Sequence, residues 1–182
     1  MAGSRGDIPS QFGKTAIVTG ATGGLGYETA LALARAGADV ILTGRDERKG
    51  QSAIEKIGRE VLGAKIAFES LDLANLAAVA AFAKRIQARP SLDLLINNAG
   101  VMALPRRQVT ADGFEMQLGT NHLGHFALTA RLLPLLRLAS APRVVSVSSL
   151  AHRTGFIDFD DLQGARVCTR HGRHMGNPSS PA

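Results

Sequence analysis

The fold is decided by the stretch Lys14-Thr15-Ala16-Ile17-Val18-Thr19-Gly20-Ala21-Thr22-Gly23-Gly24-Leu25-Gly26. Its first six residues form a short β-branched, apolar run, which is typical of a buried strand. Apolar residues then recur at helical spacing over residues 24–36, and Gly37 is well suited to end a helix. The stretch therefore predicts a strand and a helix joined by a glycine-rich turn.

Outward from this unit, strands and helices alternate along the chain. Further strands are expected at residues 38–43, 65–70, 92–97 and 143–148, and further helices at 46–62, 75–88 and 113–138. Asp46 and Asn75 are placed to cap two helices, and Pro134 is placed to kink or divide the last one. The alternation predicts an α/β fold, a Rossmann-type doubly wound parallel sheet with strands one to five present and later strands and helices missing.

Composition and the chain ends indicate the compartment and the domain plan. Cys168, the single cysteine, excludes an internal disulfide and suits a reducing compartment. Residues 1–14 are polar, and no apolar run approaches the roughly 18–20 residues of a membrane span. We therefore expect a cytoplasmic protein with no membrane span. It would have one domain over residues 1–163 and a disordered tail over 164–182, which lacks any apolar period.

The net charge of +6 does not by itself indicate a nucleic-acid partner. Half of the excess comes from Arg166, Arg170 and Arg173, in a stretch without acids. The other basic residues are mostly interleaved with acids, and aromatic residues make up only 4% of the chain. Since a nucleic-acid surface needs a basic stripe with aromatic residues between the charges, we expect none here.

The glycine turn is a candidate phosphate site. Glycines between a strand and a helix let the backbone approach a pyrophosphate, and the helix N-terminus offers free N–H groups. The residues expected to contact a dinucleotide in this turn are Gly20, Thr22, Gly23, Gly24, Leu25 and Gly26. The spacing also fits an ordinary tight bend, but its place between a buried strand and a helix favours the nucleotide site.

The end of the second strand indicates which nucleotide is preferred. NAD sites usually present an acid there to the ribose 2′-hydroxyl, whereas NADP sites present a basic group to the 2′-phosphate. This chain has Gly44-Arg45 at that point, which favours NADP(H) over NAD(H), unless Arg45 merely solvates the next helix. Asp72, after the third strand, is a candidate for the adenine edge or, alternatively, for a helix cap.

Taken in order, these motifs resemble the short-chain dehydrogenase/reductase family. They are the glycine turn, Asp72-Leu73, Asn97-Asn98-Ala99-Gly100, Asn121-His122-Leu123-Gly124-His125-Phe126, Val145-Ser146-Val147-Ser148-Ser149-Leu150-Ala151-His152 and Asp158-Phe159-Asp160-Asp161-Leu162. The residues around Asn121 and Ser149 are similar to those of the retinol-dehydrogenase-like branch of this family. The resemblance implies that Asp72, Leu73, Asn98, Ala99 and Gly100 help to bind the cofactor. It also implies that Asn121 holds a water of a proton relay and that Ser149 hydrogen-bonds the substrate oxygen.

The catalytic pair of the family is missing from these 182 residues. After Ser149 the family places a tyrosine acid/base, with a lysine four residues on, whereas here the only tyrosine is Tyr27 and the last lysine is Lys84. A phenol with a pKa of about 10 needs a nearby cation to act as a base at neutral pH. Ser149 cannot replace it, because a serine hydroxyl is less acidic still.

A frameshift is one hypothesis for the tail. With a suitable choice of codons for residues 171–181, the same DNA read two bases later encodes Arg-Lys-Ala-Tyr-Gly-Gln-Ser-Lys-Leu-Ala, which contains the missing pair. The native frame would then end between about Gly164 and Val167. Coding DNA with no open frame for this tyrosine and lysine would contradict the hypothesis.

Two His-x-x-His spacings raise the question of a metal. His122 and His125 belong to the family-like motif, whereas His171 and His174 lie in the tail. Neither pair has a cysteine or an acid at ligand spacing, so we expect no metal site.

Three functions remain open from the sequence. The first is an NADP(H)-dependent oxidoreductase acting on a small alcohol or carbonyl compound, impaired in this chain by the missing pair. The second is a non-catalytic NADP(H)-binding protein, and the third is a truncated fragment without function. The missing helix after the fifth strand should also leave a sheet face uncovered, which predicts association or poor solubility and makes the usual family dimer doubtful.

Overall fold

Five parallel strands form one sheet in the computed structural model, which describes residues 8–164. β1 (Thr15–Thr19) is central, with β2 (Asp39–Gly44) and then β3 (Ile66–Ser70) on one side. On the other side lie β4 (Leu94–Asn97) and then β5 (Arg143–Ser146). The order β3-β2-β1-β4-β5 reverses direction at β1, which confirms the predicted Rossmann-type doubly wound sheet.

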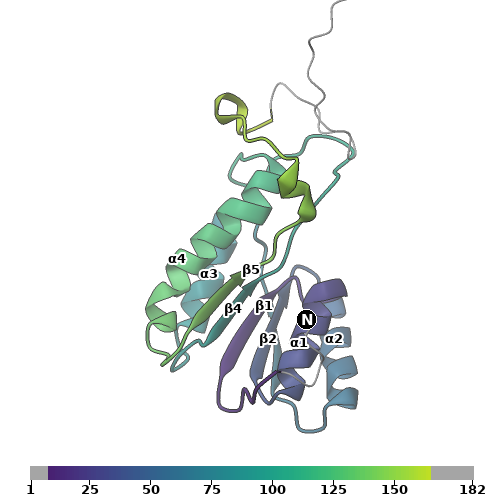
Figure 1. Cartoon of the computed structure of the whole chain (residues 1–182), viewed down its shortest axis with the longest axis vertical. Helices are drawn as coiled ribbons and strands as arrows, with labels where there is room; N and C mark the ends of the chain where they lie inside the picture. Colours follow the sequence, from purple (N-terminus) through teal and green to yellow (C-terminus); the bar gives the residue numbers. More distant parts are fainter. Residues whose placement is uncertain (1–7, 165–182) are drawn as a thin grey trace, which may run out of the picture.

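Two helices cover each face of the sheet (Figure 1). α1 (Gly24–Arg35) and α2 (Glu47–Glu60) lie on one face, and α3 (Leu76–Ile86) and α4 (His125–Leu136) on the other. Successive residues of β1 point to opposite faces, so Ile17 joins the apolar core under α3 and α4, and Val18 joins the core under α1 and α2. This burial on both faces explains why β1 is a continuous apolar run.

The two predicted helix caps are confirmed. The Asp46 carboxylate accepts a hydrogen bond from the backbone N–H of Lys49 at 3.1 Å. The Asn75 side-chain oxygen accepts one from the N–H of Ala78 at 3.0 Å. Each bond satisfies a donor in a first helical turn that has no partner within the helix.

The long helix predicted at 113–138 is present from residue 116 to residue 136, but it is not a single regular α-helix. The chain enters a π-helical turn, η2 (Leu118–Gly124), before α4 begins. Glycines explain the close packing of this turn: a Cβ on Gly119 would collide with the Thr110 side chain, and one on Gly124 with the carbonyl oxygen of Leu73. Pro134 does not divide the helix, because α4 continues past it to Leu136.

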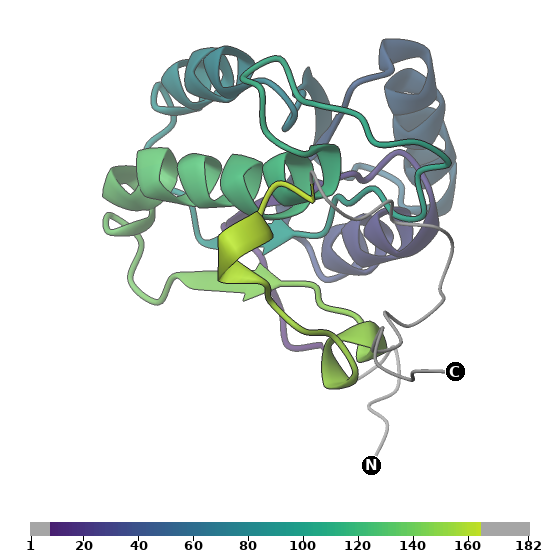
Figure 2. The ribbon, with the colours of Figure 1, turned by 90° about the horizontal axis from the view of Figure 1, so that it is seen from above.

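The last described segment lies at the open edge of the sheet. β5 is two residues shorter than predicted, and all four of its residues are exposed. Figure 2 shows β5 at the margin of the molecule, followed by the short 3₁₀ helices η3 (Leu150–Arg153) and η4 (Phe159–Asp161). Val144 and Val145 point to opposite faces of this edge strand and are both partly exposed, so the uncovered sheet face stays a prediction.

Residues 1–7 and 165–182 are outside the described part of the chain, and with them most of the predicted disordered or frameshifted tail. Within residues 8–164, no helix is both long and apolar enough to cross a membrane.

Candidate functional site

The glycine turn packs between the loop after β4 and the start of α1. Gly20 has a φ of +65°, and a Cβ at this residue would lie 2.8 Å from the Cα of Ala99. A Cβ on Gly26 would lie 2.5 Å from the carbonyl oxygen of Gly20. Only glycine fits these two positions without displacing backbone. The turn therefore packs closely against the loop after β4 and leaves open space on its other side.

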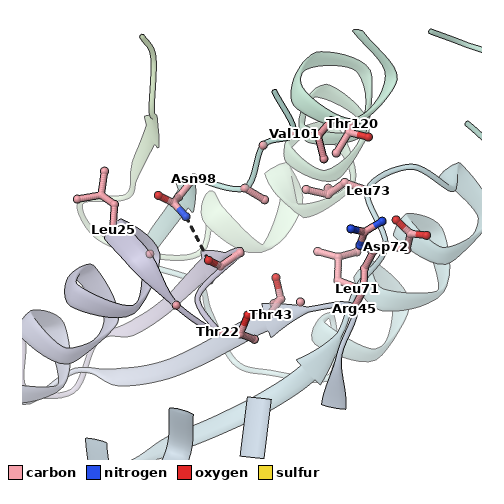
Figure 3. Close-up of a pocket in the computed structure, with 16 residues that line it drawn as sticks. Thr22, Leu25, Thr43, Arg45, Leu71, Asp72, Leu73, Asn98, Val101 and Thr120 are labelled. Carbon is pink, nitrogen blue, oxygen red and sulfur yellow. Dashed lines mark hydrogen bonds between the residues drawn. The ribbon is translucent and has the colours of Figure 1, made fainter. Parts of the chain in front are cut away.

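That space is a cavity of about 300 Å³ at the carboxyl ends of β1, β2 and β4 (Figure 3). Most of the predicted cofactor residues line it: Gly20, Thr22, Gly23, Leu25, Gly26, Arg45, Asp72, Leu73, Asn98, Ala99 and Gly100. Gly24 does not line it. Five further lining residues were not predicted as cofactor contacts: Thr43, Gly44, Leu71, Val101 and Thr120. Three of them, Thr43, Gly44 and Leu71, lie at or just beyond the end of a strand, and this position could have indicated that they line the cavity.

The side chains at the two ends of the cavity differ in character. Figure 3 shows Leu25 and Asn98 at one end and Arg45 and Asp72 at the other. Arg45 is exposed directly after β2. The Asp72 carboxylate accepts a hydrogen bond from the backbone N–H of Ala74 at 3.0 Å, so it shapes the loop after β3. The alternative role of Asp72 as the helix cap is excluded, because Asn75 caps α3.

Hydrogen bonds hold the loop of residues 98–101 against the turn. The Asn98 side-chain amide donates to the carbonyl oxygen of Thr19 at 2.8 Å. It also donates, more weakly, to the carbonyl oxygen of Gly20 at 3.4 Å, the bond drawn as a dashed line in Figure 3. At the far end of the loop, the Asn121 side chain accepts from the N–H of Val101 and donates to its carbonyl oxygen, both at 2.8 Å. The side chain of Asn121 therefore holds the loop, and the expected relay water stays a prediction.

A second cavity, of about 710 Å³, lies on the other side of the same loop. Asn121 and Ser149, the two predicted catalytic residues, both line it. It shares Asn98, Ala99, Gly100 and Val101 with the first cavity, so the loop forms a common wall. Apolar side chains of Met102, Phe126, Val144 and Val147 complete a lining suited to an apolar molecule.

Tyr27 lies in α1 and lines neither of these cavities. Burial raises its pKa above the usual 10.0, and the carboxylates of Glu60 and Glu28 raise the pKa further. Both effects disfavour the phenolate, so Tyr27 is unsuited to act as a base at either cavity.

The described residues bring together no group of three or more side chains that could hold a metal ion. His122 is exposed, whereas His125 is buried and hydrogen-bonded to protein groups through both ring nitrogens. The second histidine pair, His171 and His174, falls outside the described residues.

A cavity at the carboxyl ends of parallel strands, where the strand order reverses and a glycine turn opens a helix, is typical of the nucleotide-binding class of α/β proteins. The family model for short chain dehydrogenase matches residues 14–160. The chain belongs to the short-chain dehydrogenase family, as the sequence motifs predicted.

Curated relatives support the retinol-dehydrogenase-like branch. Human retinol dehydrogenase 13 is 50% identical over 160 residues, which are 87% of this chain and 47% of that protein. Mouse (Mus musculus) polyprenol dehydrogenase is 48% identical over 176 residues, or 94% of this chain and 50% of that protein. The chain thus spans about half the length of the curated relatives it matches.

Solved structures share the fold. A crystal structure from Mycobacterium paratuberculosis has a TM-score of 0.78 and 45% identity, covering 94% of this chain and 58% of that chain. A crystal structure from Escherichia coli CFT073 complexed with NADPH has a TM-score of 0.70 and 30% identity, covering 89% of this chain and 68% of that chain.

Proposed function

We propose that this chain binds NADP(H) in the 300 Å³ cavity and forms the cofactor-binding part of an oxidoreductase that acts on alcohol or carbonyl groups. The observation that carries the proposal is Arg45, which extends the cavity lining beyond the end of β2. No acid stands at that strand end to receive a ribose 2′-hydroxyl, and a guanidinium is well suited to a 2′-phosphate. The NADPH complex of the structural relative from Escherichia coli supports the same preference.

The residues around the cavity fit such a cofactor. Gly20 and Gly26 allow the turn to pack closely, and the N-terminus of α1 offers N–H groups to a pyrophosphate. Asp72 and Arg45 would lie towards the adenosine end, and Asn98 towards the second cavity. When bound, NADP(H) would supply or accept a hydride.

The second cavity would hold the substrate. Its apolar lining favours an apolar alcohol or aldehyde, and Ser149 would hydrogen-bond the reacting oxygen. The relatives named retinol dehydrogenase and polyprenol dehydrogenase support this substrate class.

We also propose that the 182-residue chain binds NADP(H) without rapid turnover. Tyr27 is its only tyrosine, and this residue lines neither cavity. A non-catalytic NADP(H)-binding protein is therefore the second candidate function. A carbonyl-reduction assay that follows NADPH consumption separates the two, since robust turnover by this chain would refute the second candidate and the argument from the missing pair.

Titration with NADPH and NADH tests the cofactor proposal. Arg45→Ala should weaken NADPH binding by about 10- to 100-fold, the value expected for charge-assisted hydrogen bonds to a phosphate, and should leave NADH binding nearly unchanged. Arg48→Ala is the matched control, because Arg48 is exposed one turn further along and does not line the cavity. Absence of NADPH binding by the folded chain, or equal effects of the two variants, would refute the proposal.

A further inference from the structure

His125 occupies an unusual position for a histidine at the start of a helix. It is the first residue of α4, directly after the π-helical turn, and only 6% of its surface is exposed. Its Nε2 lies 2.9 Å from the hydroxyl oxygen of Thr19, at the end of β1. Its Nδ1 lies 3.0 Å from the carbonyl oxygen of Asn121. The ring therefore connects the central strand to the turn that carries Asn121.

The hydrogen-bond partners determine which ring nitrogen carries the proton. The Asn121 carbonyl can only accept, so Nδ1 must donate. The Thr19 hydroxyl accepts the backbone N–H groups of Asn98 and Ala99, both at 2.9 Å, which uses its two lone pairs. Its own hydrogen is then directed to His125 Nε2 at 2.9 Å, in preference to the Ile96 carbonyl oxygen at 3.3 Å. This pattern requires a neutral imidazole with the proton on Nδ1.

The same ring connects the two groups that hold the common wall of the cavities. Thr19 holds the loop of residues 98–101 at its start, and Asn121 holds it at its end through Val101. At the end of the π-helical turn, the backbone N–H of His125 bonds to the His122 carbonyl oxygen, and the Asn121 carbonyl oxygen accepts the ring Nδ1–H.

We propose that His125 is a positioning residue, a neutral Nδ1–H imidazole that couples Thr19 to Asn121 and so fixes the wall shared by the two cavities. Its ring lines the second cavity, but both ring nitrogens are bonded to protein groups, so it acts through the backbone of Asn98, Ala99 and Val101. The effect on cofactor affinity rests on the proposed NADP(H) binding, whereas the tautomer does not.

Nuclear magnetic resonance of the histidine rings tests the tautomer directly. A long-range ¹H–¹⁵N spectrum of the full chain should show one ring with a protonated Nδ1 and a bare Nε2, and His125→Gln should remove that signal. His122→Gln, an exchange at an exposed residue of the preceding turn, should leave the signal in place. A His125 signal with the proton on Nε2, or one that is doubly protonated at pH 7, would overturn the proposal.

Three variants test the positioning role by NADPH titration. His125→Phe keeps a ring but loses both bonds, and should weaken binding by about five- to tenfold. His125→Gln can still accept from the Thr19 hydroxyl and should restore most of the affinity, whereas His125→Asn can reach only the Asn121 carbonyl and should not. Thermal unfolding identifies variants that are not folded. Equal losses in all three folded variants, or no loss in His125→Phe, would overturn the role, while failure of the unmodified chain to bind NADPH would refute the cofactor proposal and leave the tautomer test standing.

Discussion

Gly26→Ala should destabilise this protein even though alanine is the better helix former. The added Cβ would lie 2.5 Å from the carbonyl oxygen of Gly20 and would collide with the Asn98 amide. Overfilling a packed site costs about 1–3 kcal/mol. Loss of the Asn98 bond to the Thr19 carbonyl costs about 1 kcal/mol more. Alanine recovers about 1 kcal/mol of helix propensity, so the free energy of unfolding should fall by about 1–3 kcal/mol.

Urea unfolding followed by circular dichroism measures this difference. Gly58→Ala makes the same exchange at an exposed position within α2, where a Cβ would meet nothing within 4 Å. That control should gain up to about 1 kcal/mol, because only helix propensity changes. The folded Gly26→Ala chain should also bind NADPH more weakly, since the displaced Asn98 lines the cavity. A Gly26→Ala midpoint equal to or above that of the unmodified chain would refute the steric argument.

Three further predictions concern stability. Burial lowers the pKa of His125 below 6.5, so the unfolded chain binds a proton that the folded chain does not. Stability should therefore fall as the pH drops below about 6.5, by at most about 1.4 kcal/mol per pH unit from this residue, and urea midpoints of His125→Phe against pH should lack that part of the slope. Pro134→Ala should raise the free energy of unfolding by about 1–2 kcal/mol, because α4 runs through this exposed proline; a lower melting temperature would contradict this. Asn75→Ala should cost about 1 kcal/mol through the lost cap of α3, whereas Asn75→Asp, which keeps an acceptor, should lose little in the same melt.

Local patterns in the sequence were sufficient to predict most of the sheet and its helices. β-branched runs marked the strands, and Asp46 and Asn75 marked two helix starts, because a cap depends on residues only three positions apart. Most of the residues that line the 300 Å³ cavity could be predicted for a related reason. Parallel strands end at one edge of the sheet, so residues just after those ends meet there.

The π-helical turn could not be predicted in the same way. Its apolar spacing is that of an ordinary helix. Its glycines are required because Thr110 and Leu73, which come from other segments of the chain, leave no room for a Cβ. Pro134 does not divide α4, contrary to one of the two outcomes predicted for it. Proline removes one hydrogen bond, but the packing of Leu132, Leu135 and Leu136 in the core outweighs that loss and keeps α4 continuous.

The hydrogen bonds that hold the candidate site in place join residues that are far apart in the sequence. Thr19 and His125 are separated by 106 residues, and Thr19 lies 79 and 80 residues from Asn98 and Ala99. Neither Thr19 nor His125 lines the 300 Å³ cavity, and His125, which lines the second cavity, has both ring nitrogens bonded to protein groups. A buried hydroxyl or imidazole without partners would cost about 1–3 kcal/mol, and that cost forces such groups to pair wherever the fold brings them together. The strand order that creates the cavity also brings these hydrogen-bonding residues together, since the carboxyl ends of β1 and β4 and the turn before α4 meet there. In this protein most residues that line the 300 Å³ cavity can be predicted from local motifs, whereas the hydrogen bonds that hold them in place follow only from the fold.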